Sequence, residues 1–385
     1  MSVDAQGRGE ARAAGAQAPD ARSPRAGHPA GDSAPRPSDG GWPGYRDRVR
    51  EVLADELSVA RRRPGILSPN FGRLWARLEG TLEGGKWMRP RLVHYAYRAF
   101  GGADQLACAR LGASFEMLHA SLVIHDDVID RDFVRRGAPT VGALYRDDAA
   151  ARGHGAADAE HAGHSASIIA GDLLLAGSIK LAATAGTDSS CGTEVVDIVH
   201  GAILASAAGE LDDLLYSLDP ESVDLDQVLN MERLKTAAYS FEAPLHAGAL
   251  LAGASAADAR QLGDVGRRIG TAYQVIDDVL GTFGRPEVTG KSAESDLRAG
   301  KRTVLTAYAA QHEAFQSELA AFRAGASTID TLRAALRETG AEAHAVDLAA
   351  RLVAAALQQA ENLRLEPALL DELAGICHHV LNREK

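Results

Sequence analysis

Apolar residues recur every three or four positions from residue 44 to near the end of the chain, which predicts a series of amphipathic helices. The first two predicted helices show this pattern at residues 49–57 and 71–82. Alanine-rich helical patterns follow at 195–218, 225–252, 257–280, 303–322 and 343–361. We find no run that alternates apolar and polar residues between turn signals, so no strand is predicted. The pattern therefore predicts an all-α fold made of a single domain, residues 44–385.

Three polar stretches lack the helical pattern. Residues 1–43 are rich in Ala, Gly, Pro, Ser and Arg, which predicts a disordered tail. Residues 146–167 are rich in Ala, Gly, His and Asp, which predicts a surface loop. That stretch contains His154, His161 and His164, but neither flanking cysteines nor helical pairing supports a metal site there. Residues 284–300 carry Gly, Pro and Lys and are expected to form a mobile loop over a site.

Composition excludes several classes of function. A formal net charge of −11 argues against a nucleic-acid surface, so we expect no nucleic-acid partner. The three cysteines are isolated and indicate neither a disulfide framework nor a zinc site, which fits a reducing cytoplasm. No apolar run reaches the roughly 18 residues that a membrane span needs, so we expect no integral membrane segment. The hydrophobic content of 46% is sufficient for a large core.

Two groups of acidic residues follow apolar helical runs. Asp126, Asp127 and Asp130 come directly after the apolar run at 115–124, and their spacing places all three on one helix face. A second pair, Asp277 and Asp278, follows a similar run. A solvated acidic face is the commoner meaning of such a group, but two of them, each at the end of an apolar helix, are harder to dismiss. Carboxylates brought together repel one another unless a cation binds them, and oxygen ligands suit Mg²⁺.

Basic residues lie in turns around the acidic groups. Lys and Arg occur in five short segments, at 84–90, 135–140, 235–236, 289–291 and 300–303. Each segment alone is more typical of surface charge than of a ligand site. Together with the acidic groups they suggest phosphates bound by Mg²⁺ on one side and by Lys and Arg on the other. The sequence therefore predicts a diphosphate substrate.

Seven motifs occur in an order and spacing that resemble the trans-isoprenyl diphosphate synthases, the polyprenyl synthetase family. They are GGKWMRPRL, ASLVIHDDVIDRD with RRGAPT, IIAGDLLLAG, LKTAAYSFEAPLHAGALLAG, YQVIDDV and TGKSAESDLRAGKRTVL. The resemblance covers nearly everything after residue 45 and is closest to the geranylgeranyl diphosphate synthases of actinobacteria. It implies an isoprenoid synthase-type helical bundle with a deep central cavity, and a homodimer. It also implies that three Mg²⁺ ions help to ionise an allylic diphosphate, which isopentenyl diphosphate then attacks head to tail.

The resemblance implies a role for each matching residue. The metal ligands would be Asp126, Asp127, Asp130, Asp277 and Asp278. The allylic diphosphate would be bound by Arg135, Lys235, Lys291 and Lys301, and the carbocation would lie near Thr236, Gln274 and the Lys235 carbonyl. The pocket for isopentenyl diphosphate would consist of Lys86, Arg89, His119 and Arg136. Two positions depart from the family pattern, because Gly281 replaces a third aspartate and Glu210 replaces a common glutamine.

The helix before Asp126 is expected to measure the product, because the prenyl chain would grow along it away from the metals. Its floor would consist of Ser121 and Leu122, then Leu118, then Phe115, one, two and three turns before Asp126. Ser121 is too small to stop a fifteen-carbon chain, so we predict geranylgeranyl diphosphate. A farnesyl or longer polyprenyl product, a class I terpene cyclase and a non-catalytic partner subunit remain as alternatives. The four residues of the isopentenyl diphosphate pocket argue against the cyclase.

Overall fold

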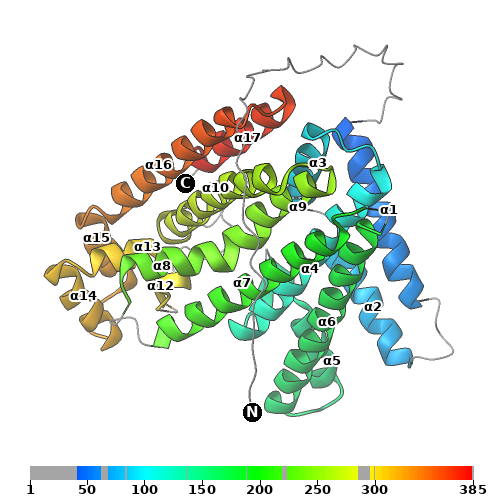
Figure 1. The fold of residues 1–385 in the computed structure, drawn as a ribbon. Coiled ribbons are helices and arrows are strands. Elements are labelled where there is room, and N and C mark those ends of the chain that lie inside the picture. Colours follow the sequence, from blue (N-terminus) through cyan, green and yellow to red (C-terminus); the bar gives the residue numbers. More distant parts are fainter. Residues whose placement is uncertain are drawn as a thin grey trace, which may run out of the picture. The chain divides into compact units, whose positions relative to one another are not determined.

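The computed structural model describes residues 41–61, 68–82, 85–135, 137–187, 189–218, 223–284, 295–298 and 300–383. The predicted disordered tail lies outside these residues except for its last three, which already belong to the first helix. The helices are α1 Gly41–Arg61, α2 Pro69–Leu82, α3 Met88–Ala99, α4 Gln105–Ile129, α5 Val141–Ala151, α6 Ala156–Ala185, α7 Gly192–Leu218, α8 Leu225–Glu232, η2 Arg233–Glu242, α9 Ala243–Leu251, α10 Ala256–Phe283, α12 Ser295–Arg298, α13 Val304–Ala309, α14 Glu313–Arg323, α15 Ile329–Glu338, α16 Ala341–Asn362 and α17 Pro367–Leu381 (Figure 1). The one sheet in the described ranges pairs β1 Val134–Arg135 with β2 Ala138–Pro139, so the all-α prediction is confirmed.

Helix α4 runs through the middle of the bundle and ends at the first acidic motif. It begins after Asp104, whose Oδ1 accepts hydrogen bonds of 2.9 Å from the backbone N–H groups of Leu106 and Ala107. Helices α1, α3 and α6 pack against it. The contact with α6 uses small polar side chains, since the Ser114 hydroxyl donates to the Ser178 carbonyl oxygen at 2.9 Å. This close packing fixes the end of α4 relative to its neighbours.

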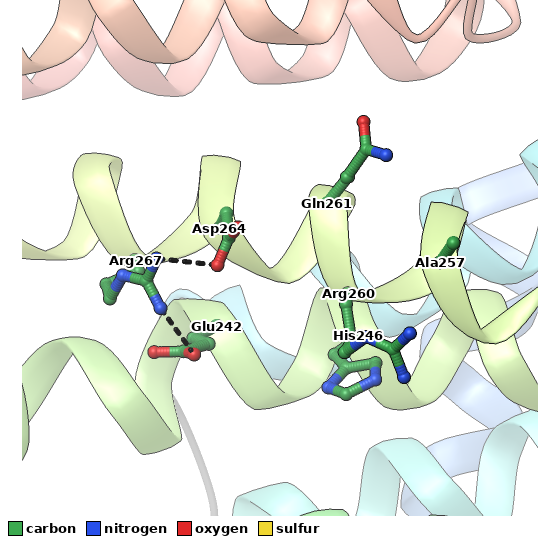
Figure 2. A pocket seen from close by; sticks show the side chains of 7 residues that line it. All are labelled: Glu242, His246, Ala257, Arg260, Gln261, Asp264 and Arg267. Carbon is green, nitrogen blue, oxygen red and sulfur yellow. Dashed lines mark hydrogen bonds and ion pairs between the residues drawn. The ribbon is translucent and has the colours of Figure 1, made fainter.

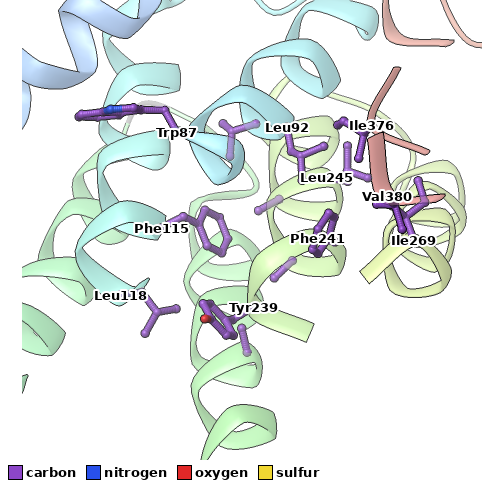
Figure 3. Close-up of a cluster of buried hydrophobic side chains, with 14 of the residues drawn as sticks. Trp87, Leu92, Phe115, Leu118, Tyr239, Phe241, Leu245, Ile269, Ile376 and Val380 are labelled. Carbon is purple, nitrogen blue, oxygen red and sulfur yellow. The ribbon is translucent and has the colours of Figure 1, made fainter. Parts of the chain in front are cut away.

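Large apolar side chains from α3, α4, η2, α9, α10 and α17 form the core beside the site (Figure 3). Phe115, Leu92 and Leu245 are completely buried, and Ile269 is 1% exposed. Burying a side chain of this size stabilises the fold by about 1.5–3 kcal/mol relative to leaving it in water. The core therefore ties the helices that carry the acidic motifs to the helices that carry the predicted cations.

The predicted loop at 146–167 is wrong. The structure continues α5 to Ala151, turns through Arg152–Gly155, and begins α6 at Ala156. The small residues that made this stretch look like a loop let the two helices approach, because a Cβ on Gly163 would lie 2.6 Å from the Gly142 carbonyl oxygen. Alanine is also the strongest helix former, so a polar alanine-rich segment folds as helix once its small face is buried.

Two other predicted helices are interrupted. The segment predicted at 303–322 forms α13 and α14, separated by a turn at 310–312. The segment predicted at 225–252 forms α8, the π-helical η2 and α9. Only Gly284, Ser295–Arg298 and Gly300 of the predicted mobile loop belong to the described residues, and Ser295–Arg298 forms the short helix α12.

One helix in the described part of the chain, α6, is long and apolar enough to cross a membrane by length and composition alone. It packs against α4, α5 and α7, which buries part of its apolar surface, whereas Ile168, Ile169 and Ile179 remain exposed.

Candidate functional site

The carboxylates of the first acidic motif lie at the end of α4, and each one contacts a cation from another part of the chain. Asp126 and Asp127 occupy the last turn, and Asp130 follows as the C-cap residue. Arg135 contacts Asp126 and Asp127. Its Nη2 lies 2.5 Å from Asp126 Oδ2, and its Nε lies 2.5 Å from Asp127 Oδ1. Lys301 Nζ lies 2.8 Å from Asp130 Oδ2. The structure therefore brings the three acids of the first motif together with Arg135 and Lys301.

A short hairpin positions Arg135. Strands β1 and β2 pair in antiparallel register, Arg135 opposite Ala138, with Gly137 at φ 74° in the turn. Phe133, at the base of the hairpin, stacks on His164 of α6 with ring centroids 5.3 Å apart. Helix α6, whose first part was predicted to be a loop, therefore supports the hairpin. Arg136, predicted to bind isopentenyl diphosphate, lies outside the described residues.

Lys235 extends from the π-helical segment η2 toward the first acidic motif. Its Nζ lies 3.3 Å from Asp126 Oδ1, 3.0 Å from Glu210 Oε1 and 2.7 Å from Asp213 Oδ2. Helix α7 lies close to the backbone of η2 at this point, since a Cβ on Gly209 would lie 2.3 Å from the backbone nitrogen of Lys235. A π-helical turn at this point is typical of functional sites, where a wider helix redirects a side chain. Thr236, next along η2, is half-buried.

The second acidic pair lies near the end of α10. Asp277 is half exposed and accepts a hydrogen bond of 2.9 Å from Arg383, near the end of the chain. Asp278 is 7% exposed and accepts a hydrogen bond of 2.9 Å from Gln274 Nε2, one turn earlier. Gly281 lies one further turn along this helix and contributes no side chain to the pair.

A buried carboxyl group accompanies Asp278. Glu232, the last residue of α8, is 3% exposed, and its carboxyl group interacts with that of Asp278. Burial raises the pKa of Glu232 well above its usual value, and the negative charge of Asp278 raises it further. No sequence motif pointed to Glu232, because its partner lies on a distant helix.

The two aspartates at the end of α4 differ electrostatically. Burial would raise the pKa of Asp126, but Lys235, Arg135 and Lys301 together hold that pKa below its usual value. Burial raises the pKa of Asp127 to about 6, although Arg135 opposes the shift. Burial lowers the pKa of Lys235, but its three carboxylate neighbours outweigh this and raise it above its usual value. Lys235 is therefore firmly protonated, which its predicted role in binding a diphosphate requires.

Tyr239 joins two of the residues predicted to bind isopentenyl diphosphate. Arg89 Nη2 donates to Ser240 Oγ at 2.9 Å and to the Tyr239 hydroxyl at 3.3 Å. His119 Nδ1 lies 3.3 Å from the same hydroxyl. Lys86 is exposed, and its Nζ lies 3.1 Å from His379 Nε2 on α17. Sequence reasoning missed Tyr239, although it shares a helix segment with Lys235.

The predicted chain-length residues divide between two environments. Phe115, Leu118 and Ser121 are completely buried, whereas Leu122 is half-buried. Figure 3 shows Phe115 and Leu118 pointing toward the segment that carries Tyr239. Ser121 instead faces α6, where its hydroxyl donates to the Gly171 carbonyl oxygen at 2.8 Å. A larger residue at 121 would therefore have to fit between α4 and α6.

The donor set suits a hard divalent cation, because all five predicted ligands are carboxylates. The aspartates of the first motif and Asp277 contact Arg or Lys, and in the described part of the chain no three metal-binding side chains gather in a cluster. A metal could bind these acids only if the cations moved away. Incoming phosphate groups would supply the alternative partners for those cations. Lys291, predicted to bind the allylic diphosphate, lies outside the described residues.

A separate open groove of about 480 Å³ lies between α10 and the segment formed by η2 and α9 (Figure 2). Arg267 spans it, with contacts of 3.2 Å to Glu242 and 2.6 Å to Asp264. None of the predicted site residues lines this groove, so it is distinct from the acidic site.

Comparison with known proteins agrees with the motifs. A family model described as polyprenyl synthetase matches residues 76–339. The geranylfarnesyl diphosphate synthase of Aeropyrum pernix is 37% identical over 238 residues, which cover 61% of this chain and 69% of that protein. The geranylgeranyl diphosphate synthase of Sulfolobus acidocaldarius is 35% identical over 225 residues, which cover 58% of this chain and 62% of that protein. The (2E,6E)-farnesyl diphosphate synthase of Mycobacterium tuberculosis is 35% identical over 228 residues, which cover 59% of this chain and 57% of that protein.

A solved structure extends the likeness to most of the chain. It is a geranylgeranyl pyrophosphate synthase from Corynebacterium glutamicum, complexed with isoprenyl diphosphate and magnesium. It superposes with a TM-score of 0.80 at 31% identity, covering 88% of this chain and 99% of that one. By contrast, the sequence matches to the second and third relatives span only about three fifths of those proteins.

Proposed function

Because the chain belongs to the polyprenyl synthetase family, we propose that it is a Mg²⁺-dependent trans-prenyltransferase that makes geranylgeranyl diphosphate. The substrates would be isopentenyl diphosphate and an allylic diphosphate. The allylic C–O bond breaks and releases diphosphate, a new C–C bond forms to the terminal carbon of isopentenyl diphosphate, and a proton is lost. The single observation that carries the proposal is the pairing of Asp126, Asp127 and Asp130 with Arg135, Lys235 and Lys301.

This arrangement fits diphosphate departure. Arg135, Lys235 and Lys301 are already gathered at one point, and a phosphate oxygen can replace the carboxylate that each now contacts. Cations fixed there stabilise the leaving diphosphate more than the intact substrate, because its charge grows as the C–O bond breaks. Bound Mg²⁺, held by the five aspartates, would neutralise part of the same charge.

The second substrate requires a separate anion pocket. Arg89 and His119 both contact the Tyr239 hydroxyl, so the three side chains form a connected group in the described structure. Such a group can hold a diphosphate directly, without metal. A terpene cyclase has no need for this pocket, so its presence favours a condensation reaction.

Product length is the finer part of the proposal. Relatives of this chain make products from farnesyl to octaprenyl diphosphate, so family membership alone leaves the length open. Ser121 is small and faces α6, so it puts no bulk in the path of a growing chain one turn below Asp126, which favours a product longer than farnesyl diphosphate. The completely buried Phe115 and Leu118 offer the deeper stop that a twenty-carbon chain would meet. A farnesyl or a longer product remains the alternative.

We also propose a homodimer, with α6 and α7 at its interface. These helices expose large apolar side chains, namely Ile168, Ile169, Ile179, Leu204, Leu211, Leu214, Leu215 and Leu218. An apolar face of this kind marks an interaction surface, and a second copy can cover it by two-fold symmetry. Light scattering should give the mass of a dimer for the wild type and of a monomer for Leu204→Glu combined with Leu215→Glu.

The proposed activity is tested by incubating the purified chain with Mg²⁺, isopentenyl diphosphate and each of the three short allylic diphosphates in turn. Chromatography of the prenyl alcohols released by phosphatase should show the twenty-carbon alcohol as the main product. A chain that consumes no isopentenyl diphosphate with any starter is not a prenyl diphosphate synthase.

A further inference from the structure

Glu210 departs from the family pattern at a point that touches the predicted diphosphate site. It lies on α7, and its Oε1 is 3.0 Å from Lys235 Nζ. Its side chain is 21% exposed, so water screens this ion pair only partly. A glutamine would offer Lys235 a neutral oxygen in the same place, whereas Glu210 offers a full negative charge.

The charges around Lys235 are unbalanced. Three carboxylates, from Asp126, Glu210 and Asp213, lie within 3.3 Å of the single ammonium group. Arg135 also pairs with Asp126, but Lys235 is the cation that Glu210 contacts in the part of the chain that the structure describes. A diphosphate that binds Lys235 must therefore compete with Glu210 and is also repelled by it.

We propose that Glu210 weakens the binding of the allylic diphosphate by competing for Lys235, and so tunes the affinity of this site. The inference rests on the proposed function, because it assigns Lys235 to the allylic diphosphate. Glu210 is a positioning residue, since it acts through Lys235. The same competition opposes diphosphate binding before and during C–O cleavage, so it raises KM for the allylic substrate and leaves kcat unchanged. The pocket at Arg89 and His119 should be unaffected.

The test compares Glu210→Gln with a matched control on the same helix. Glutamine keeps the size and an acceptor oxygen and removes only the charge. Asp212→Asn removes one negative charge two residues away, from a side chain that makes no ion pair with Lys235 in the described structure. Calorimetric titration with inorganic pyrophosphate at saturating Mg²⁺ measures diphosphate affinity without turnover, and steady-state kinetics give KM for each substrate.

We expect Glu210→Gln to bind pyrophosphate about fivefold more tightly than the wild type, the change expected for one partly exposed ion pair. KM for the allylic diphosphate should fall by a similar factor, while KM for isopentenyl diphosphate stays the same. Asp212→Asn should change pyrophosphate affinity less than twofold. Equal or weaker binding by Glu210→Gln would overturn the inference, and so would an equal gain in Asp212→Asn. If the wild type binds pyrophosphate but consumes no isopentenyl diphosphate, the proposed function fails while the pyrophosphate titrations still decide on Glu210.

Discussion

Replacing Arg135 should affect metal and diphosphate binding in opposite directions. In the described structure its guanidinium lies 2.5 Å from a carboxylate oxygen of Asp126 and 2.5 Å from one of Asp127, which are two of the predicted metal ligands. Arg135→Gln removes this charge and keeps most of the side-chain length. Mg²⁺ then meets two carboxylates that no longer pair with Arg135, whereas a diphosphate loses one of its predicted cations.

The size of the effect follows from the two contacts. The side chains of Arg135, Asp126 and Asp127 are 22%, 20% and 8% exposed, so their ion pairs are stronger than fully exposed ones. A charge-assisted hydrogen bond contributes about 1.5–3 kcal/mol, and partial solvation reduces this to about 1 kcal/mol per contact. Losing both contacts should favour metal binding by about 2 kcal/mol, or about 30-fold in Kd.

The assay is calorimetric titration of the substrate-free protein with Mg²⁺ at pH 8.5, where both aspartates can ionise, followed by titration with inorganic pyrophosphate. Arg135→Gln should bind Mg²⁺ alone about 30-fold more tightly and bind pyrophosphate more weakly than the wild type. Arg351→Gln, which breaks an ion pair with Asp347 on the surface of α16, should change neither affinity. The reasoning fails if the Mg²⁺ affinity of Arg135→Gln is unchanged or reduced.

Three further predictions test separate parts of the structure. The pKa of Asp127 is about 6 in the folded protein, compared with 3.8 for a free aspartate. Its contribution to the free energy of unfolding should therefore fall by roughly 2 kcal/mol as the pH rises from 4 to 6. Thermal melts of metal-free Asp127→Asn should lack this decline. Gly209→Ala would place a Cβ 2.3 Å from the backbone nitrogen of Lys235, so we expect the free energy of unfolding in urea to fall by about 1–3 kcal/mol and turnover to be lost. Gly201→Ala, on the same helix with open space around it, should be tolerated. Ser121→Phe should shorten the product to fifteen carbons, and unchanged product chromatography in a folded variant would refute the floor assignment.

The geometry of the first acidic motif could be predicted from the sequence because it is local. Asp126 and Asp130 are one helical turn apart wherever that helix lies, and Arg135 follows within a hairpin whose turn is marked by Gly137. Short-range spacing therefore fixed which side chains could meet.

The partners supplied by distant segments could not be predicted in the same way. Asp213 belongs to neither of the acidic groups that the sequence singled out, yet it is 9% exposed and its Oδ2 lies 2.7 Å from Lys235 Nζ. Tyr239, Glu232 and Arg383 reach the site from segments whose local pattern is that of ordinary core or surface helix. Their roles depend on how helices pack, and periodicity along one helix carries no information about its neighbour.

The wrong prediction of a surface loop at residues 146–167 has a related cause. Composition suggested a polar loop, but small residues such as Gly142 and Gly163 allow α5 and α6 to pack closely. Helix α6 supports the hairpin of Arg135 through the stacking of Phe133 on His164, so a segment predicted to be a surface loop helps to build the site.

Because Gly281 contributes no side chain to the second acidic pair, we expect the first acidic motif to carry most of the metal binding needed for turnover. The most direct measurement is the rate of incorporation of labelled isopentenyl diphosphate into prenyl product by Asp126→Ala and Gly281→Asp, with the exposed Asp147→Ala as a control. We expect Asp126→Ala to lose turnover, and Gly281→Asp and Asp147→Ala to retain rates near that of the wild type. Near-normal incorporation by Asp126→Ala would contradict the assignment.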